Sequence, residues 1–338
     1  MSKKNNPKQY FTIDLVKLIM AIFVIAIHTH PFENIKPGVF MTIYNTVVSC
    51  AVPFFFISSG FLIFEKTNKS EEIKNLSTYL KKIIKLYIIW TLIYLPLTIY
   101  GLINNDRSSI SDIFEFIRGF FIIGENYNSW MLWYLLSMIY SLVLIIILLK
   151  NKFNLKNIYI LSVLLFIIAE IITIYTQKID LTPVFIQKPL EYFKFIFING
   201  RLFIGMFYIM TGAIISKYKK KYFTFIYIGL ILLIANLLIN ELFSYTYIAI
   251  FSIIIFLITL TINFKESLIF KKLREASTIF YFTHMIFYSI YTIIILKKPD
   301  HYGFDSFIIS FICCILISIV LIKMKKHKNF KWLKVIIN

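Results

Sequence analysis

The stretch IDLVKLIMAIFVIAIHTHP, residues 13–31, places ionisable side chains inside a run of otherwise apolar residues. A helix of about 20 apolar residues crosses the ~30 Å hydrocarbon layer of a bilayer, so the stretch predicts a transmembrane helix. A charged group in that layer costs about 2.5–3.5 kcal/mol on insertion scales. Asp14, Lys17 and His28 therefore need a partner or a role.

Lys17 and His28 are eleven residues apart. At roughly 100° per residue this is three helical turns plus about 20°, so both side chains lie on one face, separated by about 16 Å along the axis. Asp14 and Lys17 are neighbours on the same helix and can form an ion pair. A simpler interpretation is that Asp14 and Lys17 snorkel to the inner interface and that His28 and His30 merely begin the outer loop.

Apolar blocks of similar length recur along all 338 residues, of which 59% are hydrophobic and 16% charged. This composition excludes an ordinary soluble domain and predicts an all-α fold, a polytopic membrane bundle of about ten transmembrane helices in a single domain. Pro53 and Pro96 are expected to kink their helices. The blocks are residues 11–30, 40–64, 83–103, 130–149, 157–176, 202–216, 222–239, 243–262, 277–296 and 306–322.

The net charge of +19 is a topology signal. Most of the 36 lysines and arginines lie in alternate segments between the blocks, which places both termini in the cytoplasm. We expect cytoplasmic tails at residues 1–9 and 323–338, a bundle at 10–322, and membrane lipid rather than nucleic acid as the partner of the basic residues. The abundance of isoleucine, lysine and asparagine suggests a bacterial source, and hence a location in the bacterial cell membrane.

Three further features bear on chemistry. The three cysteines lie in apolar blocks without zinc or redox spacing, so we expect neither a metal nor a bound cofactor. Glu170 lies in the fifth block, where an acid is functional or paired within the bundle. His284, in TIFYFTHMIFYS, lies in the ninth. A lone membrane histidine more often serves packing or hydrogen bonding, but two histidines in different spans suggest a shared polar cavity.

Together, these motifs resemble the acyltransferase-3 family of membrane acyltransferases. Lys17 and His28 match its signature of a basic residue and a histidine separated by ten residues, with lysine where arginine is commoner. AVPFFFISSGFLIF, residues 51–64, is similar to the family's Ser-Gly-Phe motif. SWMLWYLLSMIY, ING at 198–200 and IFYFTHM follow in the family's order. The second span most resembles the membrane half of VanT-type serine racemases, and because no racemase domain follows it here, we expect no racemase activity.

The resemblance implies a reaction and roles. In the family, an acyl group passes from cytoplasmic acyl-CoA, as co-substrate, to a hydroxyl on an extracytoplasmic acceptor, here a cell-envelope glycan or peptidoglycan component. His28 is then the catalytic residue, as general base or as the site of an acyl-histidine intermediate, and Lys17 with Asp14 binds acyl-CoA, most simply acetyl-CoA. The candidate cavity residues or oxyanion donors are His284, Ser58, Ser59, Trp130, Glu170 and Arg201. Arg201 also fits a role as an interfacial anchor.

A transporter is the alternative hypothesis. The same polar face would line a path for a small amino acid such as serine or for a polysaccharide, without acyl transfer. An inverted repeat with paired interrupted helices is typical of such folds, and none is evident in the sequence. The sequence therefore favours the enzyme.

Overall fold

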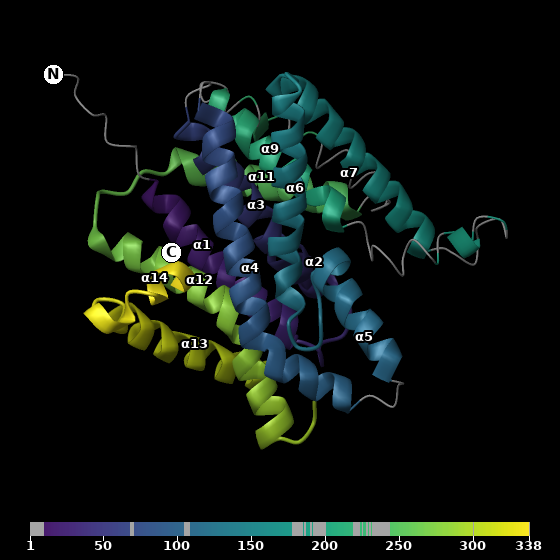
Figure 1. Ribbon diagram of the computed structural model, residues 1–338, viewed down its shortest axis with the longest axis vertical. Helices are drawn as coiled ribbons and strands as arrows, with labels where there is room; N and C mark the ends of the chain where they lie inside the picture. The colour runs from purple at the N-terminus through teal and green to yellow at the C-terminus, as the bar shows by residue number, and fades with distance from the viewer. Residues whose placement is uncertain are drawn as a thin grey trace.

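The structure, a computed structural model, describes residues 10–67, 71–104, 109–177, 201–218, 244–299 and 301–337, with isolated positions between 185 and 231. Every regular element in this part of the chain is helical, which confirms the predicted all-α bundle (Figure 1). The main helices are α1 (Phe11–Thr29), α2 (Val39–Ser49), α3 (Ala51–Glu65), α4 (Glu72–Ile103), α5 (Ser109–Arg118), α6 (Trp133–Lys150), α7 (Leu155–Gln177), α9 (Arg201–Lys217), α11 (Ser244–Thr261), α12 (Leu268–Ser289), α13 (Phe304–Met324) and α14 (Leu333–Ile337).

Seven candidate spans among the described helices are long and apolar enough to cross a membrane. Two shorter apolar helices, Ile204–Lys217 and Tyr245–Thr261, match the predicted sixth and eighth spans. The predicted seventh span, residues 222–239, lies almost wholly outside the described residues. The chain is therefore a multi-pass membrane protein, and the sidedness inferred from its charges stays a prediction.

Two sequence boundaries differ from the structure. α4 begins at Glu72 rather than in the apolar block at 83, because its first turns are polar and escape a hydropathy pattern. The C-terminal segment forms α14, whose Leu333 and Ile337 are buried against Ile279 of α12. A buried ion pair between Lys325 and Glu275 joins the same two regions. This segment packs on the bundle and is more than a basic tail.

The second predicted span is interrupted at Cys50, where α2 ends and α3 begins. Pro53 lies in the first turn of α3 and has no backbone N–H, so it cannot continue the hydrogen-bond ladder of α2. The helix is thus interrupted three residues before Pro53, whereas α4 continues through Pro96 as one helix. The break at Cys50 turns Ser49, Val52 and Pro53 toward the cavity described below.

Contact between α3 and α9 depends on two glycines. A Cβ atom added at Gly60 would lie 2.1 Å from the carbonyl oxygen of Ile209, and one added at Gly212 would lie 2.1 Å from that of Ile57. Small residues of this kind let membrane helices approach until their backbones touch. Gly60, which belongs to the Ser-Gly-Phe motif, therefore has a packing role.

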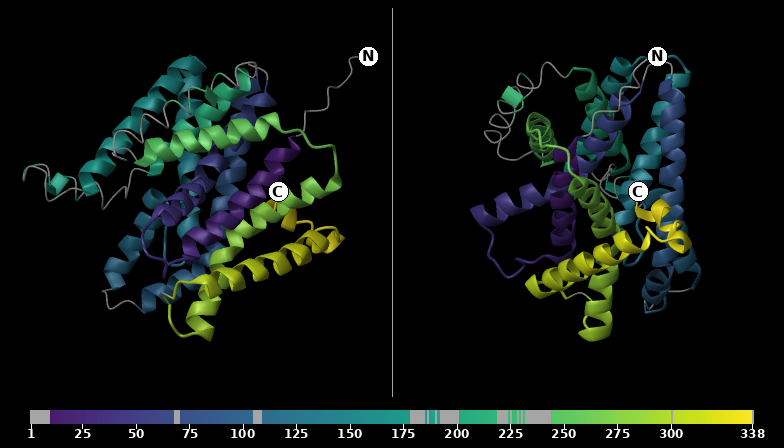
Figure 2. Two further views of the ribbon diagram at one scale, coloured as in Figure 1. Left: turned by 180° about the vertical axis from the view of Figure 1, so that it is seen from behind. Right: turned by 90° about the vertical axis from the view of Figure 1, so that its left-hand side faces the viewer.

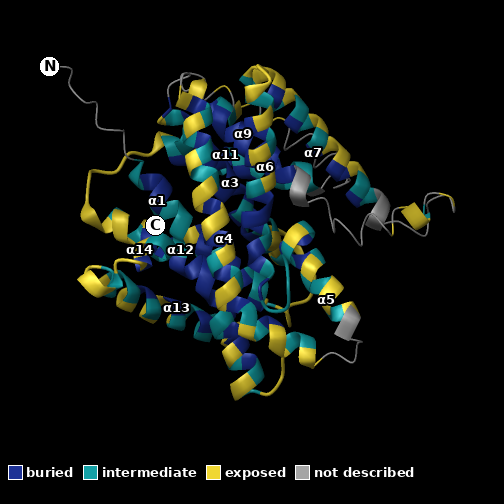
Figure 3. Ribbon diagram, in the orientation of Figure 1, coloured by how far each residue is buried: buried dark blue, intermediate teal, exposed yellow. Residues whose placement is uncertain are grey.

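The buried core forms where the central helices meet, and the peripheral helices carry exposed stripes (Figure 3). α3 is largely buried, whereas α13 is largely exposed. Seen from behind, α1 lies alongside α12, and α12 lies alongside α13 (Figure 2). The neighbour of the helix that carries Lys17 and His28 is thus the helix that carries His284.

Candidate active site

His28 lies near the end of α1 between two aromatic rings. Its ring centroid is 6.1 Å from that of Trp130, with planes 26° apart, and 5.2 Å from that of His284, with planes 29° apart. Trp130 begins the short 3₁₀ turn Trp130–Leu132 before α6, and His284 comes from α12. The ring of His28 therefore meets aromatic rings from two segments that are distant from α1 in the sequence.

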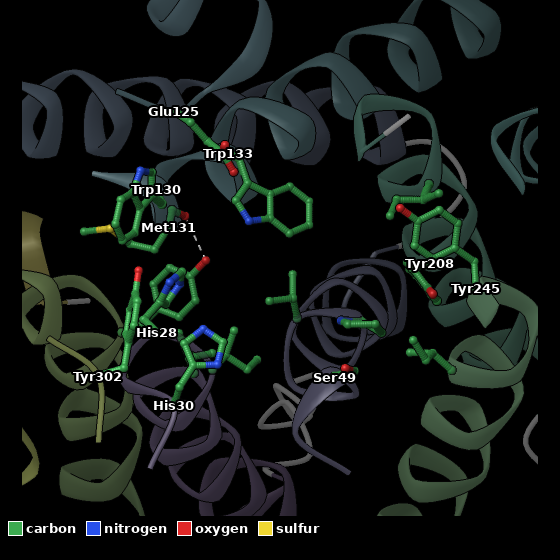
Figure 4. Close-up of a pocket in the computed structure, with 17 residues that line it drawn as sticks. His28, His30, Ser49, Glu125, Trp130, Met131, Trp133, Tyr208, Tyr245 and Tyr302 are labelled. Carbon is green, nitrogen blue, oxygen red and sulfur yellow. Dashed lines mark hydrogen bonds between the residues drawn. The ribbon is translucent and has the colours of Figure 1, made fainter. Parts of the chain in front are cut away.

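A cavity of about 500 Å³ adjoins this stack. In Figure 4, His28, His30, Trp130 and Tyr302 lie on one side of it, and Tyr208 and Tyr245 lie on the other. The volume is within the range of small-molecule sites, and the lining combines apolar walls with a few polar groups, as such sites do. The lining residues are Val24, Ile27, His28, His30, Ser49, Val52, Pro53, Glu125, Trp130, Met131, Trp133, Ile204, Tyr208, Tyr245, Ile248, Tyr281 and Tyr302.

The C-terminal end of α1 is fixed to the α12–α13 connection. His30 ends the helix in a left-handed conformation, and its backbone N–H donates to the carbonyl of Ala26. Gly303 donates its N–H to the carbonyl of Thr29 at 2.9 Å, and the ring of Tyr302 meets His30 edge to face at 4.9 Å. These contacts close one wall of the cavity beside His28.

The N-terminal half of α1 carries a different kind of site. Lys17 lies close enough to Arg274 of α12, Lys82 of α4 and Lys66, which follows α3, to interact with them electrostatically. Asp14 is the carboxylate in this group. Arg274, Lys66 and Lys82 are exposed. We call Lys17, Lys66, Lys82 and Arg274 the basic cluster, and its excess of positive charge suits a polyanionic ligand.

The ion pair of Asp14 corrects the sequence-based expectation. Asp14, which is buried, pairs with Arg274 at 3.8 Å, while Lys17 interacts with Asp14 electrostatically. Spacing along α1 cannot reveal this partner, because Arg274 comes from a helix 260 positions along the chain. Asp14 therefore holds the guanidinium of Arg274 beside Lys17.

The sequence predicts that Glu170 is either functional or paired within the bundle. In the structure it is paired, and it does not line the cavity. Its carboxylate accepts hydrogen bonds from the backbone N–H groups of Tyr245 at 3.1 Å and Thr246 at 2.7 Å, and from the Thr246 hydroxyl at 3.2 Å. These amides belong to the first turn of α11, which has no intrahelical acceptors. Glu170 thus caps α11 and fixes Tyr245, which does line the cavity.

Replacing Glu170 with alanine is expected to lower stability by about 1–3 kcal/mol, because first-turn amides of α11 lose their acceptor inside the bundle. A thermal melt of the purified protein in detergent measures this. Glu266→Ala, at an exposed position before α12, is the matched control and should melt like the parent. Equal melting temperatures for both variants and the parent would show that the cap contributes nothing.

Ser58 and Ser59 do not join the cavity. Ser58 is fully buried and donates to the carbonyl of Phe55 at 3.0 Å, and Ser59 lies 3.5 Å from the Tyr134 hydroxyl. Neither serine lines the cavity, so neither is placed to stabilise an oxyanion there. Arg201 begins α9, and its side chain lies outside the described residues.

Sequence reasoning missed most of the cavity wall. Tyr208, Tyr245, Tyr281 and Tyr302 come from α9, α11, α12 and the α12–α13 connection. Each lies in an aromatic-rich stretch where tyrosine is common, so no local signal distinguishes it. Tyr245, Tyr281 and Tyr302 each lie one helical turn from a charged residue or a histidine in the sequence, but many aromatic residues outside the cavity do as well.

These features define a multi-pass helical membrane protein with a histidine cavity at one end of α1 and a basic cluster toward the other. A family model described as an acyltransferase domain matches residues 10–323. The chain therefore belongs to the acyltransferase-3 family of membrane acyltransferases.

Curated relatives are longer proteins. An amino-acid racemase of Enterococcus faecalis is 33% identical over 142 residues, which cover 41% of this chain and 19% of the relative. A serine/alanine racemase of Enterococcus gallinarum is 26% identical over 216 residues, which cover 62% of this chain and 29% of the relative. The chain thus spans less than a third of the length of these relatives. No solved structure matches.

Proposed function

We propose that this protein transfers an acyl group, most simply acetyl, from cytoplasmic acyl-CoA to a hydroxyl of a cell-envelope glycan or peptidoglycan component at the bacterial plasma membrane. The observation that carries the proposal is the placement of Lys17, one member of the basic cluster, and of His28 on one face of α1, about 16 Å apart along the helix axis. A pantetheine arm of comparable length can join a nucleotide held by the basic cluster to a thioester at His28.

The chemistry needs a base, because a hydroxyl is a weak nucleophile at neutral pH. A neutral His28 takes the proton of the acceptor hydroxyl as its oxygen bonds to the thioester carbonyl. The carbon–sulfur bond then breaks, and His28 returns the proton to the departing thiolate, which leaves as free coenzyme A. The proton and the acyl group are both accounted for without a further reactant.

In this scheme Trp130 stabilises the protonated ring of His28 rather than an oxyanion. When His28 holds the proton it is a cation, and the indole face stacked at 6.1 Å favours a cation. The cavity walls also keep bulk water from the thioester, which favours transfer over hydrolysis. The aromatic lining suits the apolar faces of sugar rings.

Lys17→Ala is expected to raise the Michaelis constant for acetyl-CoA by at least about tenfold, with a much smaller change in kcat. The variant loses one charge-assisted contact to a phosphate, and such contacts are worth about 1.5–3 kcal/mol. Steady-state release of coenzyme A by the purified protein measures both constants, with a mixture of soluble muropeptides and chitooligosaccharides as acceptors.

Acetyl-pantetheine, which lacks the nucleotide, is the matched control donor. Lys17→Ala and the parent should use it equally, because the phosphates are absent. An unchanged Michaelis constant for acetyl-CoA, or an equal loss with acetyl-pantetheine, would contradict nucleotide binding by the basic cluster.

The second candidate function is a transporter, and the likeness to racemases named for serine and alanine supports it. The same assay separates the two functions. A transporter releases no coenzyme A from acetyl-CoA with any acceptor, and its His28 variants change substrate flux in proteoliposomes instead.

A further inference from the structure

His284 is fully buried in α12, and one of its ring nitrogens is committed. Nδ1 lies 3.1 Å from the carbonyl oxygen of Phe280. A carbonyl only accepts hydrogen bonds, so Nδ1 carries the hydrogen, and in the neutral ring Nε2 then has a lone pair and no proton. Neutral His284 therefore cannot donate to an oxyanion from Nε2, which corrects the donor role expected from the sequence.

Nε2 of His284 is a buried acceptor that has no hydrogen-bond partner in the described part of the chain. Buried polar atoms without partners are rare, and each one calls for an explanation. Two nearby hydroxyls on α12 are engaged elsewhere: Tyr281 donates to the carbonyl of Met131 at 2.9 Å, and Thr283 donates to that of Ile279 at 2.8 Å.

The ring of His28 is a suitable donor. Its centroid is 5.2 Å from that of His284, and the two planes differ by 29°. The terminal torsion of a histidine is broad, so the His28 ring can rotate to turn one of its N–H groups toward His284. We propose that His284 is a positioning residue that accepts a hydrogen bond from His28 in the reacting state and thereby fixes the tautomer of His28.

This inference rests on the proposed acyl transfer and sharpens it. With one N–H of His28 held by His284, the second nitrogen keeps a lone pair toward the cavity, where the acceptor hydroxyl lies. After that nitrogen takes the hydroxyl proton, the bond to His284 becomes charge-assisted and stronger. The proton then passes to the leaving thiolate, and His28 returns to its starting tautomer. His284 neither gains nor loses a proton.

Two substitutions separate positioning from packing. His284→Gln keeps an acceptor oxygen near the place of Nε2, whereas His284→Phe keeps the ring shape and removes the acceptor. We expect kcat/KM for acetyl-CoA to fall about a hundredfold in His284→Phe and no more than about tenfold in His284→Gln. His327→Phe, at an exposed position after α13, is the matched control and should behave like the parent.

A pH profile adds a readout that a packing role would not change. Because His284 favours the protonated form of His28, its loss should move the acidic limb of kcat/KM to lower pH by about one unit in His284→Phe. The other titratable groups that line the cavity are His30, Glu125, Tyr208, Tyr245, Tyr281 and Tyr302. They are unchanged in the variant and in the control, so the shift is specific to His284.

The same titration is measurable without turnover. Diethyl pyrocarbonate modifies neutral imidazole, and peptide mass spectrometry reports the modification of His28 as a function of pH. The midpoint should be lower in His284→Phe than in the parent and in His284→Gln. The role of His284 would be overturned if His284→Phe left both the modification midpoint of His28 and kcat/KM unchanged. It would also be overturned if His284→Phe and His284→Gln lost kcat/KM equally. If the parent releases no coenzyme A, but the midpoint of His28 modification is still lower in His284→Phe than in the parent, the proposed function alone is overturned.

Discussion

Replacing His28 with alanine is expected to lower acyl-CoA-dependent transfer by at least about a hundredfold, because general-base help of this kind contributes about 10²–10⁴ in rate. The binding of acetyl-CoA should change little, since the basic cluster lies about 16 Å away along α1. Coenzyme A release under saturating acetyl-CoA measures the loss. His327→Ala is the matched control.

The alanine variant also permits a rescue experiment. His28 lines a cavity of about 500 Å³, and removal of its side chain leaves room for an imidazole molecule between Trp130 and His284. Added imidazole should restore part of the lost rate in His28→Ala and have no such effect on the parent. Full activity of His28→Ala without imidazole would show that His28 is not the base.

Gly60→Ala and Gly212→Ala are expected to destabilise the bundle by about 3 kcal/mol or more each, at or above the upper end of the range for overpacked sites. Each new Cβ would lie 2.1 Å from a backbone carbonyl oxygen on the opposite helix, and backbone cannot move aside as a flexible side chain can. α3 and α9 would have to separate. Thermal melts followed by size-exclusion chromatography in detergent measure the effect.

Gly38→Ala provides the control for the glycine variants. Its nearest contact would be the Lys36 carbonyl oxygen at 4.0 Å, an ordinary van der Waals distance, so this variant should melt with the parent. If Gly60→Ala and Gly212→Ala also melted with the parent, the close approach of α3 and α9 would be wrong.

The helix content and the shared face of Lys17 and His28 were predictable, because each depends on spacing along a single helix. The break at Cys50 was not predictable from proline alone, because α4 continues through Pro96, which also lacks a backbone donor. The transmembrane blocks follow from the requirement that lipid imposes on every backbone polar group.

The partners of these residues were not predictable, because they depend on which helices pack together. Asp14 has Lys17 within reach on its own helix, yet its ion pair is with Arg274 of α12. Glu170 appears in sequence as an isolated membrane acid, and only the position of α11 shows that it caps a helix. His284 was expected to share a cavity with His28, and the structure brings the two rings together while placing His284 behind the cavity wall.

We propose that acyl transfer crosses the bundle along α1, from the basic cluster to His28. The most direct measurement uses sealed proteoliposomes containing the oriented protein, with radiolabelled acetyl-CoA on the side of the basic cluster and soluble muropeptides and chitooligosaccharides on the other. We predict coenzyme A release on the first side and labelled acceptor on the second, both lost in His28→Ala. Label that never reaches the acceptor side, or that reaches it equally in His28→Ala, would contradict the account.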